Sequence, residues 1–496
     1  MKKKLLLTTL AVLLFGSALP VHAAPQYMAD GAVFDAEWYL EQNSDLAAAF
    51  PADVSPEVLY QHYVTFGQKE GRSPYNAATF NPDDIAPGQD TTTPSTPPAP
   101  SNLTPVSSSN KDTQNYRWYS NYDWNWADTV KSHLYENPAG GVTRVEYVDG
   151  QIIVEDYDDS FYLRSNRTIP MELSLWGGFF AGENYNFVIF GQENPTQNND
   201  TEVIRVLKYS KDWKRLGQTS LRGANTTVPF DAGSLRCAEY GDYLYIRTCH
   251  EMYASARDGK NHQANLTLTV RQSDMALTDT YYIVMNSSVG YVSHSFNQFV
   301  LVDQNQNIVT LDHGDAHPRS IVVMRYKSAK AGGDKFSGGV AESDLVTFSG
   351  AVGDNYTGAT TGGFAETENG YVTALNYDAT GTGIRDIYLG YTSKNGLNAT
   401  LNGVTALTGM RTPVLAPTGL DGGYLMWTDV NNTFYYTRYA DGGTVGTIST
   451  APAALSDCQP ICHNGEVIWY VTSYSAPVFY KINAAGVLSK IPANGQ

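Results

Sequence analysis

One unit recurs through most of this 496-residue chain and constrains its fold more than any other feature. The unit is an apolar strand, a polar break of variable length, a second apolar strand with Tyr, Lys or Arg near its end, and a Gly, Asp or Ser turn. Seven copies are found, beginning at Gln151, Asn186, Asp242, Asn307, Gly370, Gly423 and Glu466. A chain that repeats one such unit buries its core by stacking the copies against one another.

The spacing of the copies predicts a propeller, because it brackets the roughly 40 to 50 residues of a four-stranded blade. A β-sandwich also contains many short strands, but it would not repeat the same unit over so long a stretch. We therefore predict an all-β fold for residues 116–496, a seven-bladed β-propeller with six or eight blades as the alternatives. The aligned strands should be the two middle strands of each blade.

The N-terminal sequence "MKKKLLLTTLAVLLFGSALPVHAAP" predicts a secretory signal peptide over residues 1–23. Three lysines precede an apolar stretch, and small residues follow it at Ala23 and Ala24. The stretch is shorter than the roughly 20 apolar residues of a membrane-spanning helix, and no later stretch is longer. We expect a secreted or cell-surface protein without a transmembrane segment.

Residues 27–76 predict a small helical module. Asp35 and Asn43 suit helix N-caps, Pro56 suits a helix start and Gly67 a helix end, while His62 is expected to pack inside the module. The stretches "FDAEWYLEQNSDLA" and "HYVTFGQKEGRSP" resemble a short module of bacterial secreted and cell-surface proteins. The resemblance implies an envelope-associated context and no chemistry. Residues 77–115 are rich in Pro, Ser and Thr and predict a disordered linker.

Charge and cysteine content restrict the partners and the covalent links. A net charge of -17 excludes nucleic acid as a partner, because phosphate binding needs clustered Lys and Arg. Of the four cysteines, the spacing in "CQPIC" predicts a disulfide between Cys458 and Cys462. The pairing of Cys237 and Cys249 stays open.

Five of the nine histidines are expected to gather on one face of the third and fourth blades, where the second strands end. Neighbouring polar residues complete a candidate binding site, which consists of His250, Glu251, His262, Gln263, Asn265, His294, Asp312, His313, Asp315, His317 and Arg319. The site could bind a carbohydrate or another small polar ligand, or a divalent metal ion through imidazole and carboxylate groups. In the third interpretation these loop residues only satisfy one another's hydrogen bonds.

The leading hypothesis is a ligand-binding propeller whose partner is a carbohydrate or a surface protein. The alternative is an enzyme, a glycan-active hydrolase or lyase or a sulfotransferase-like protein, that uses the histidine-rich face, with or without a metal. No nucleophile motif of the G-x-S-x-G kind and no phosphate-binding loop is present. The stretches "GANTTVPFDAGSLR", "TCHEMY", "NHQAN" and "LDHGDAHPRS" resemble secreted propeller proteins of gut-type bacteria. That resemblance implies no activity and no catalytic residue.

Overall fold

The computed structural model describes residues 26–28, 32–50, 54–76, 102–111, 127–281, 285–287, 290–291, 293–316, 319–330, 340–354, 356–406 and 409–495. The chain divides into two compact units, Met1–Ala99 and Pro100–Gln496. The expected signal peptide lies outside the described residues. Within those residues, no helix has the length and apolar character needed to cross a membrane.

The first unit is a small helical module. Its elements are β1 (Gln26–Tyr27), β2 (Val33–Phe34), α1 (Ala36–Gln42), α2 (Ser44–Ala49), α3 (Pro56–His62) and a π-helical turn η1 (Tyr63–Gly67). Asp35 caps α1, because its side chain accepts a hydrogen bond from Trp38 N at 2.9 Å. His62 packs inside the module, where its Nδ1 lies 3.2 Å from Tyr39 Oη.

An arginine explains the polar residues of the module's motif. Arg72 forms an ion pair with Asp45 at 2.8 Å and another with Glu70 at 2.6 Å. It also donates to Asn43 Oδ1 at 2.9 Å. The guanidinium therefore ties the start of α2 to the turn that follows η1, and it uses the Asn, Asp and Glu of the motif to do so.

The second unit is built of four-stranded antiparallel sheets, as the repeat predicts. Blade 1 comprises β4 (Ser132–Glu136), β5 (Val142–Val148), β6 (Gln151–Tyr157) and β7 (Leu163–Pro170). Blade 2 comprises β8 (Leu175–Ala181), β9 (Tyr185–Gly191), β10 (Glu202–Ser210) and β11 (Arg215–Arg222). In blade 3 the first strand is split into β12 (Thr226–Pro229) and β13 (Arg236–Tyr240), which both pair with β14 (Tyr243–Ala254). The other strands of blade 3 are β15 (Asn261–Arg271) and β16 (Ala276–Tyr281).

The remaining four blades follow the same order. Blade 4 comprises β19 (Ser293–Val302), β20 (Asn307–Ala316), β21 (Arg319–Lys330) and β22 (Val340–Thr347), after a hairpin of β17 (Met285–Ser287) and β18 (Gly290–Tyr291). Blade 5 comprises β23 (Ala359–Glu366), β24 (Gly370–Tyr377), β25 (Asp386–Ser393) and β26 (Ala399–Gly403). Blade 6 comprises β27 (Val414–Gly419), β28 (Gly422–Thr428), β29 (Phe434–Ala440) and β30 (Ser449–Ala451). Blade 7 comprises β31 (Ile461–His463), β32 (Glu466–Val471), β34 (Val478–Ile482) and β35 (Leu488–Pro492).

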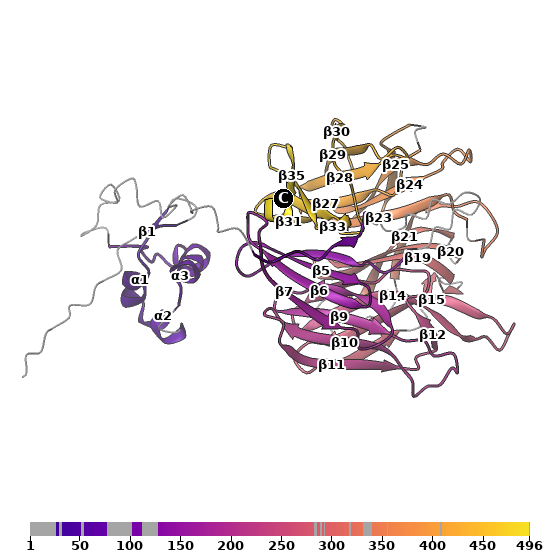
Figure 1. The fold of residues 1–496 in the computed structure, drawn as a ribbon, viewed down its shortest axis with the longest axis horizontal. Coiled ribbons are helices and arrows are strands. Elements are labelled where there is room, and N and C mark those ends of the chain that lie inside the picture. Colours follow the sequence, from indigo (N-terminus) through magenta and orange to yellow (C-terminus); the bar gives the residue numbers. More distant parts are fainter. Residues whose placement is uncertain are drawn as a thin grey trace, which may run out of the picture. The chain divides into compact units, whose positions relative to one another are not determined.

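The seven sheets close into a ring, which confirms the seven-bladed propeller. The innermost strands of neighbouring blades are in contact, and β31 of the last blade contacts β4 of the first. Figure 1 shows the yellow strands of blade 7 beside the purple strands of blade 1. We call the face where the innermost strands begin and the second strands end the top face, and the other the bottom face.

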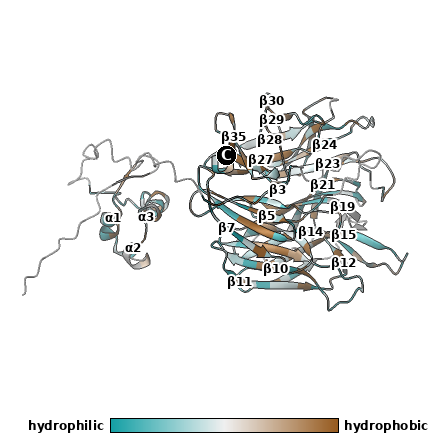
Figure 2. Cartoon of the chain, viewed as in Figure 1, coloured by the Kyte–Doolittle hydropathy of each residue, from teal (hydrophilic) through white to brown (hydrophobic). Residues whose placement is uncertain are grey.

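The second strand of each blade is largely buried on both faces because each blade packs between two others. Six successive residues of β9 are buried, from Asn186 to Gly191, and all seven of β28 are buried. Figure 2 shows brown, hydrophobic colour along these strands and teal colour in the connecting loops. This burial explains why the middle strands carried the repeat.

The first copy of the repeat is offset by one strand, which corrects the alignment. The copy that begins at Gln151 contains β6 and β7, the third and fourth strands of blade 1, whereas the other copies contain the second and third. The second strand, β5, includes the charged residues Arg144 and Glu146, which are fully or almost fully buried. These charged residues interrupt the apolar pattern of β5, and for that reason the sequence repeat did not include this strand.

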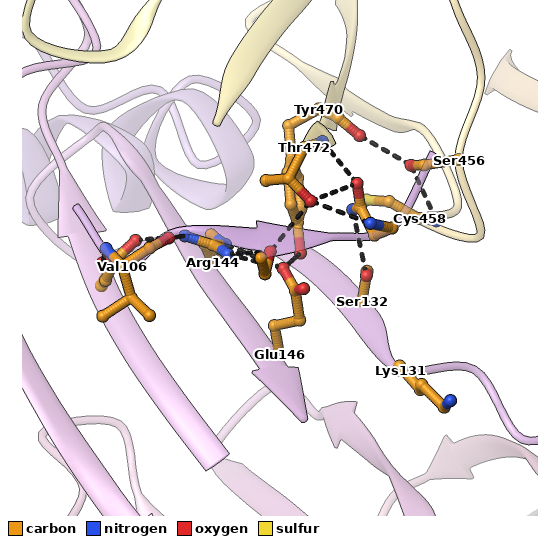
Figure 3. Close-up of polar contacts among 12 residues, drawn as sticks. Val106, Lys131, Ser132, Arg144, Glu146, Ser456, Cys458, Tyr470 and Thr472 are labelled. Carbon is orange, nitrogen blue, oxygen red and sulfur yellow. Dashed lines mark hydrogen bonds and ion pairs between the residues drawn. The ribbon is translucent and has the colours of Figure 1, made fainter. Parts of the chain in front are cut away.

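Residues 102–111 belong to the propeller unit, although the sequence placed them in the linker and the propeller's start at residue 116. A short strand β3 (Ser108–Ser109) pairs with β33 (Ser473–Ser475) in blade 7. Arg144 donates to Val106 O at 2.9 Å, as Figure 3 shows. It also donates to Ser108 Oγ at 2.8 Å. The segment is polar, so composition alone could not reveal that it lies between blades 7 and 1.

All four cysteines are free in the structure, so it does not contain the predicted disulfide between Cys458 and Cys462. Cys458 is buried in the apolar cluster between blades 7 and 1, whereas Cys462 is exposed. Short spacing in the sequence does not bring these thiols together, since one points into a core and the other is in water. Burial also raises the pKa of the Cys458 thiol.

Candidate functional site

The predicted site residues of blade 3 lie mostly inside the propeller. His250 is fully buried and shares a hydrogen bond of 2.6 Å with Thr226 Oγ1. Asn265 is also fully buried, and its Oδ1 accepts from Gln298 Nε2 at 3.2 Å. The strands β14 and β15 extend over stretches that the sequence assigned to an exposed loop, which leaves only residues 255–260 between them. Backbone hydrogen bonds between β14 and β15 therefore hold these polar residues in the sheet.

The predicted residues of blade 4 are buried in the same way. Asp312 forms an ion pair with Arg247 of blade 3, and both side chains are fully buried. His313 Nε2 lies 2.8 Å from Thr357 Oγ1, and its ring packs against Phe348. Burial lowers the pKa of His313 to about 3, so its ring is neutral. A group that is buried and neutral in this way cannot contact a ligand on the surface.

Asp315 and Arg319 hold a connection between blades 4 and 5. Arg319 donates to the backbone carbonyls of Ser349, Asp354 and Tyr356. Asp315 is buried, and its own carbonyl accepts from Gly353 N at 3.3 Å. Both residues therefore have structural partners in the loop of residues 349–356.

Two predicted residues are half-buried, and two more lie wholly or partly outside the described residues. Glu251 is half-buried, and its pKa is raised by burial and by the nearby carboxylates of Asp231 and Glu193. His262 is half-buried and forms a pair with Asp258 at 3.0 Å. The side chain of His294 and all of His317 lie outside the described residues.

The predicted histidine cluster is therefore not an open site where it is described. Within the described part of the chain, no three His, Cys, Asp or Glu side chains are arranged to hold a metal ion. His250 and His313 each share one hydrogen bond with a threonine hydroxyl. Of the three interpretations, these residues fit mutual hydrogen bonding inside the fold.

A hollow on the top face, over blades 1 to 3, is a better candidate. It has a volume of about 420 Å³ and is open to solvent. Its lining consists of Asp128, Thr129, Lys131, Tyr147, Ser174, Leu175, Trp176, Val228, Pro229, Phe230, Asp231 and Ala232. These residues come from the segment before β4, the end of β5, the start of β8 and the break between β12 and β13.

The break between β12 and β13 is strained at the hollow. Phe230 and Ala232 have φ angles of 63° and 52°, in the left-handed region that non-glycine residues rarely adopt. Each such residue costs about 1–3 kcal/mol and persists only where its surroundings hold it. The Phe230 ring lies against Gly177 and Gly191, where an added Cβ would come within 2.7 and 2.6 Å of its carbons. Larger residues at either glycine would expel the ring.

Residues of the predicted site hold this strained segment from below. The carbonyl of Asp231 accepts from Cys249 Sγ at 3.0 Å and from Gln263 Nε2. The amide of Phe230 donates to Cys249 O at 2.9 Å. Gln263, expected to touch a ligand, is instead buried and supports a segment that lines the hollow.

Aromatic and charged groups share the hollow. Tyr147 stacks on Trp176 with ring centroids 5.7 Å apart and planes 7° apart. The Trp176 indole donates to Val130 O at 2.8 Å, which fixes its orientation. Carboxylates of Asp128 and Asp231 and the ammonium of Lys131 lie around these rings. Trp176 is only 6% exposed and is covered by Tyr147 on one face, so the half-buried Tyr147 is the ring that the hollow can offer, together with donors and acceptors for a polar ligand.

The backbone beneath Lys131 is anchored to blade 7. Lys131 N donates to Asp457 Oδ2 at 2.8 Å. Burial raises the pKa of Asp457 to about 7. Arg236 lies close enough for Asp457 to act on its charge, and burial lowers the pKa of Arg236 to about 10. Asp457 is therefore a group behind the hollow whose pKa lies near neutral pH.

A second hollow, of about 210 Å³, lies on the bottom face between blades 7 and 1. Its charged groups bind one another or neighbouring residues. Glu466 pairs with Lys481 at 2.8 Å, and Asp158 pairs with Arg164. It has half the volume of the hollow on the top face and neither Tyr nor Trp in its lining, so we regard it as the weaker candidate.

The sequence did not single out the hollow on the top face. Tyr147 and Trp176 have the apolar neighbours of ordinary core residues, and Asp128 and Asp231 are about a hundred residues apart. One signal was present: the polar stretch "GANTTVPFDAGSLR" interrupts the strand pattern at Phe230. A break in an innermost strand could have pointed to this segment.

No protein-family model matches the chain, and no curated protein matches it. Solved structures with a similar fold include the BP39L lectin from Burkholderia pseudomallei, at 9% identity and a TM-score of 0.46, covering 73% of this chain and 98% of that one. The fission yeast SREBP-SCAP binding domains give 8% identity and a TM-score of 0.36, covering 63% and 73%.

A Synechocystis apocarotenoid oxygenase gives 8% identity and a TM-score of 0.30, covering 67% of this chain. The chain spans 63% of that oxygenase and 64% of an ACO/RPE65 chimera. At these identities and TM-scores, none of the matches carries an argument about function.

Proposed function

We propose that this chain is a binding protein whose propeller takes a carbohydrate in the hollow on the top face. The observation that carries the proposal is the lining itself, in which the stacked rings of Tyr147 and Trp176 lie among carboxylates and an ammonium group. Sugars present apolar C–H faces and many hydroxyls, so they need both kinds of contact at once. A purely apolar ligand would make use of the rings alone.

The support beneath the hollow favours a preformed site. The segment of residues 230–232 keeps two residues in left-handed backbone and is held by Cys249 and Gln263. Strain of this kind is found at binding sites, where it presents a side chain in a fixed geometry. A preformed site loses less conformational entropy when its ligand binds.

We further propose that the protein is exported and acts outside the cell, where carbohydrate ligands are abundant. The expected signal peptide and the module of residues 27–76 support this localisation. The acidic chain, with its net charge of -17, suits a soluble extracellular protein and disfavours nucleic acid.

The test fills the hollow without removing a contact. Ser174 lies exposed at the edge of the hollow, so Ser174→Trp should place an indole in it and leave the core intact. The matched control is Ser160→Trp, at an exposed position on the bottom face. Both proteins and the wild type are screened on an array of neutral, amino and acidic oligosaccharides, and affinities are then measured by titration calorimetry.

We expect the wild type and Ser160→Trp to bind the same sugars, and Ser174→Trp to lose at least tenfold in affinity. Circular dichroism and thermal unfolding check that all three proteins fold alike. Binding that Ser174→Trp retains would place the site elsewhere. If the wild-type protein binds no sugar on the array, the proposal is refuted.

A further inference from the structure

Tyr474 is an exposed aromatic residue in a strained backbone. Its side chain is 83% exposed, the largest exposure among the large hydrophobic residues of the described chain. Its φ angle is 57°, in the left-handed region. For an L-residue that conformation costs about 1–2 kcal/mol, and a ring in water returns none of this cost through packing. Folding therefore gives no reason for a tyrosine at this position.

The loop around Tyr474 is nevertheless held firmly. Its strand β33 pairs with β3, with Ser473 opposite Ser109 and Ser475 opposite Ser108. Just before it, Thr472 N and Oγ1 donate to Asn110 Oδ1 at 2.5 and 2.8 Å. The segment of residues 102–111 thus fixes the loop from one side, so that the ring is presented from a rigid base.

Tyr474 and the hollow lie on the same face of adjacent blades. The loop between β32 and β34 follows the second strand of blade 7, and Lys131 lies at the start of the innermost strand of blade 1. A chain of hydrogen bonds joins them: Lys131 N donates to Asp457, and Asp457 N donates to Asn110 O at 3.3 Å. Asn110 Nδ2 also donates to Ser132 Oγ at 3.0 Å, and Figure 3 shows Ser132 between Thr472 and Lys131.

We propose that Tyr474 is a second sugar-stacking point and that the ligand is an extended oligosaccharide, which runs from the hollow across to blade 7. This inference rests on the proposed function. Two weak contacts on one rigid scaffold raise the affinity of a ligand that reaches both, because the second contact forms at high effective concentration. A single sugar can reach only one of them. The affinity should therefore increase with the length of the oligosaccharide.

The experiment measures affinity against chain length. Titration calorimetry uses neutral glucan, N-acetylglucosamine and uronate oligomers of one to six sugars, with the full chain. The variants are Tyr474→Ala and the control Tyr240→Ala, which removes a 38% exposed tyrosine at the end of β13, on the bottom face. Ser174→Trp, which blocks the hollow, is measured alongside.

We expect the wild type and Tyr240→Ala to gain at least tenfold in affinity between short and long oligomers. Tyr474→Ala should bind the short oligomers as the wild type does and lose the gain, whereas Ser174→Trp should weaken binding at every length. Tyr474→Gly relieves the backbone strain, so its melting temperature should equal or exceed that of the wild type, while its binding matches Tyr474→Ala.

The outcomes separate the two proposals. If the wild type binds sugars and Tyr474→Ala keeps the full gain with length, the inference about Tyr474 is wrong and the hollow stands. If the wild type binds no oligomer, the proposed function fails and the inference fails with it.

Discussion

Arg144 joins the first and last blades through a charged cluster that is closed to water. The guanidinium donates to Glu146 at 2.8 Å and to Glu155 at 2.8 Å, and none of the three side chains is more than 3% exposed. Its remaining donors reach Val106 O and Ser108 Oγ in the segment of residues 102–111. Within the described residues, blades 1 and 7 share no sheet strand, so this cluster, the pairing of β3 with β33 and the apolar contacts between the two blades hold the ring closed.

Arg144→Met keeps a side chain of similar length but removes the charge. Two buried carboxylates then lose their counter-charge, and breaking a buried pair in this way costs about 3–5 kcal/mol. That is a large part of the roughly 5–15 kcal/mol by which a domain is stable. We expect a loss of this size in urea unfolding at neutral pH, followed by tryptophan fluorescence.

The reasoning depends on charge, so a neutral variant should recover the loss. In the triple variant Arg144→Met, Glu146→Gln and Glu155→Gln these three charges are all removed, and replacing buried ion pairs by neutral groups is often close to energetically neutral. We expect at least half of the lost stability to return. A loss below about 1 kcal/mol for Arg144→Met, or a triple variant no more stable than the single one, would refute the argument.

Three further predictions follow from the described contacts. His313→Ala should lower the free energy of unfolding in urea by about 2–4 kcal/mol, because the change removes a buried ring and a hydrogen bond. The sugar affinity should stay within twofold of the wild type. A loss of affinity at unchanged stability would show that His313 is a binding residue after all. Asp457 has a pKa raised to about 7 from its usual 3.8, so the folded state binds more protons and stability should fall as the pH rises from 4 to 7. Asp457→Asn should flatten that dependence in thermal unfolding, and an unchanged slope would assign it to other groups. Gly67→Ala would place a Cβ 2.3 Å from Tyr39 Oη and should speed amide exchange in residues 36–67 alone, whereas unchanged exchange would show that the tyrosine moves freely aside.

The seven-bladed fold followed from local sequence because hydrophobic periodicity is a local property. The second strand of each blade is largely buried on both faces, so it reads as an apolar run whatever its neighbours are. The same local pattern failed at β5, where Arg144 and Glu146 are buried by pairing with each other. A charge that is compensated by a distant segment has no local signature.

The candidate site shows a similar division. The sequence placed polar residues such as His250 and Gln263 near the top face, and they do lie in the second and third strands of blade 3. It could not tell that neighbouring blades bury them. Tyr147, in contrast, was not singled out by the sequence, yet it lines the hollow together with residues of blades 2 and 3.

By itself, then, the sequence determined the repeat, the blade number and the helical module, since each depends on residues close together in the chain. Only the tertiary structure decided which polar groups are buried, where the hollow lies and how the ring closes. Those features depend on contacts between distant residues, such as Asn110 with Thr472 and Lys131 with Asp457. The energy of a polar side chain is set by what surrounds it, and in a propeller most of its surroundings come from other blades.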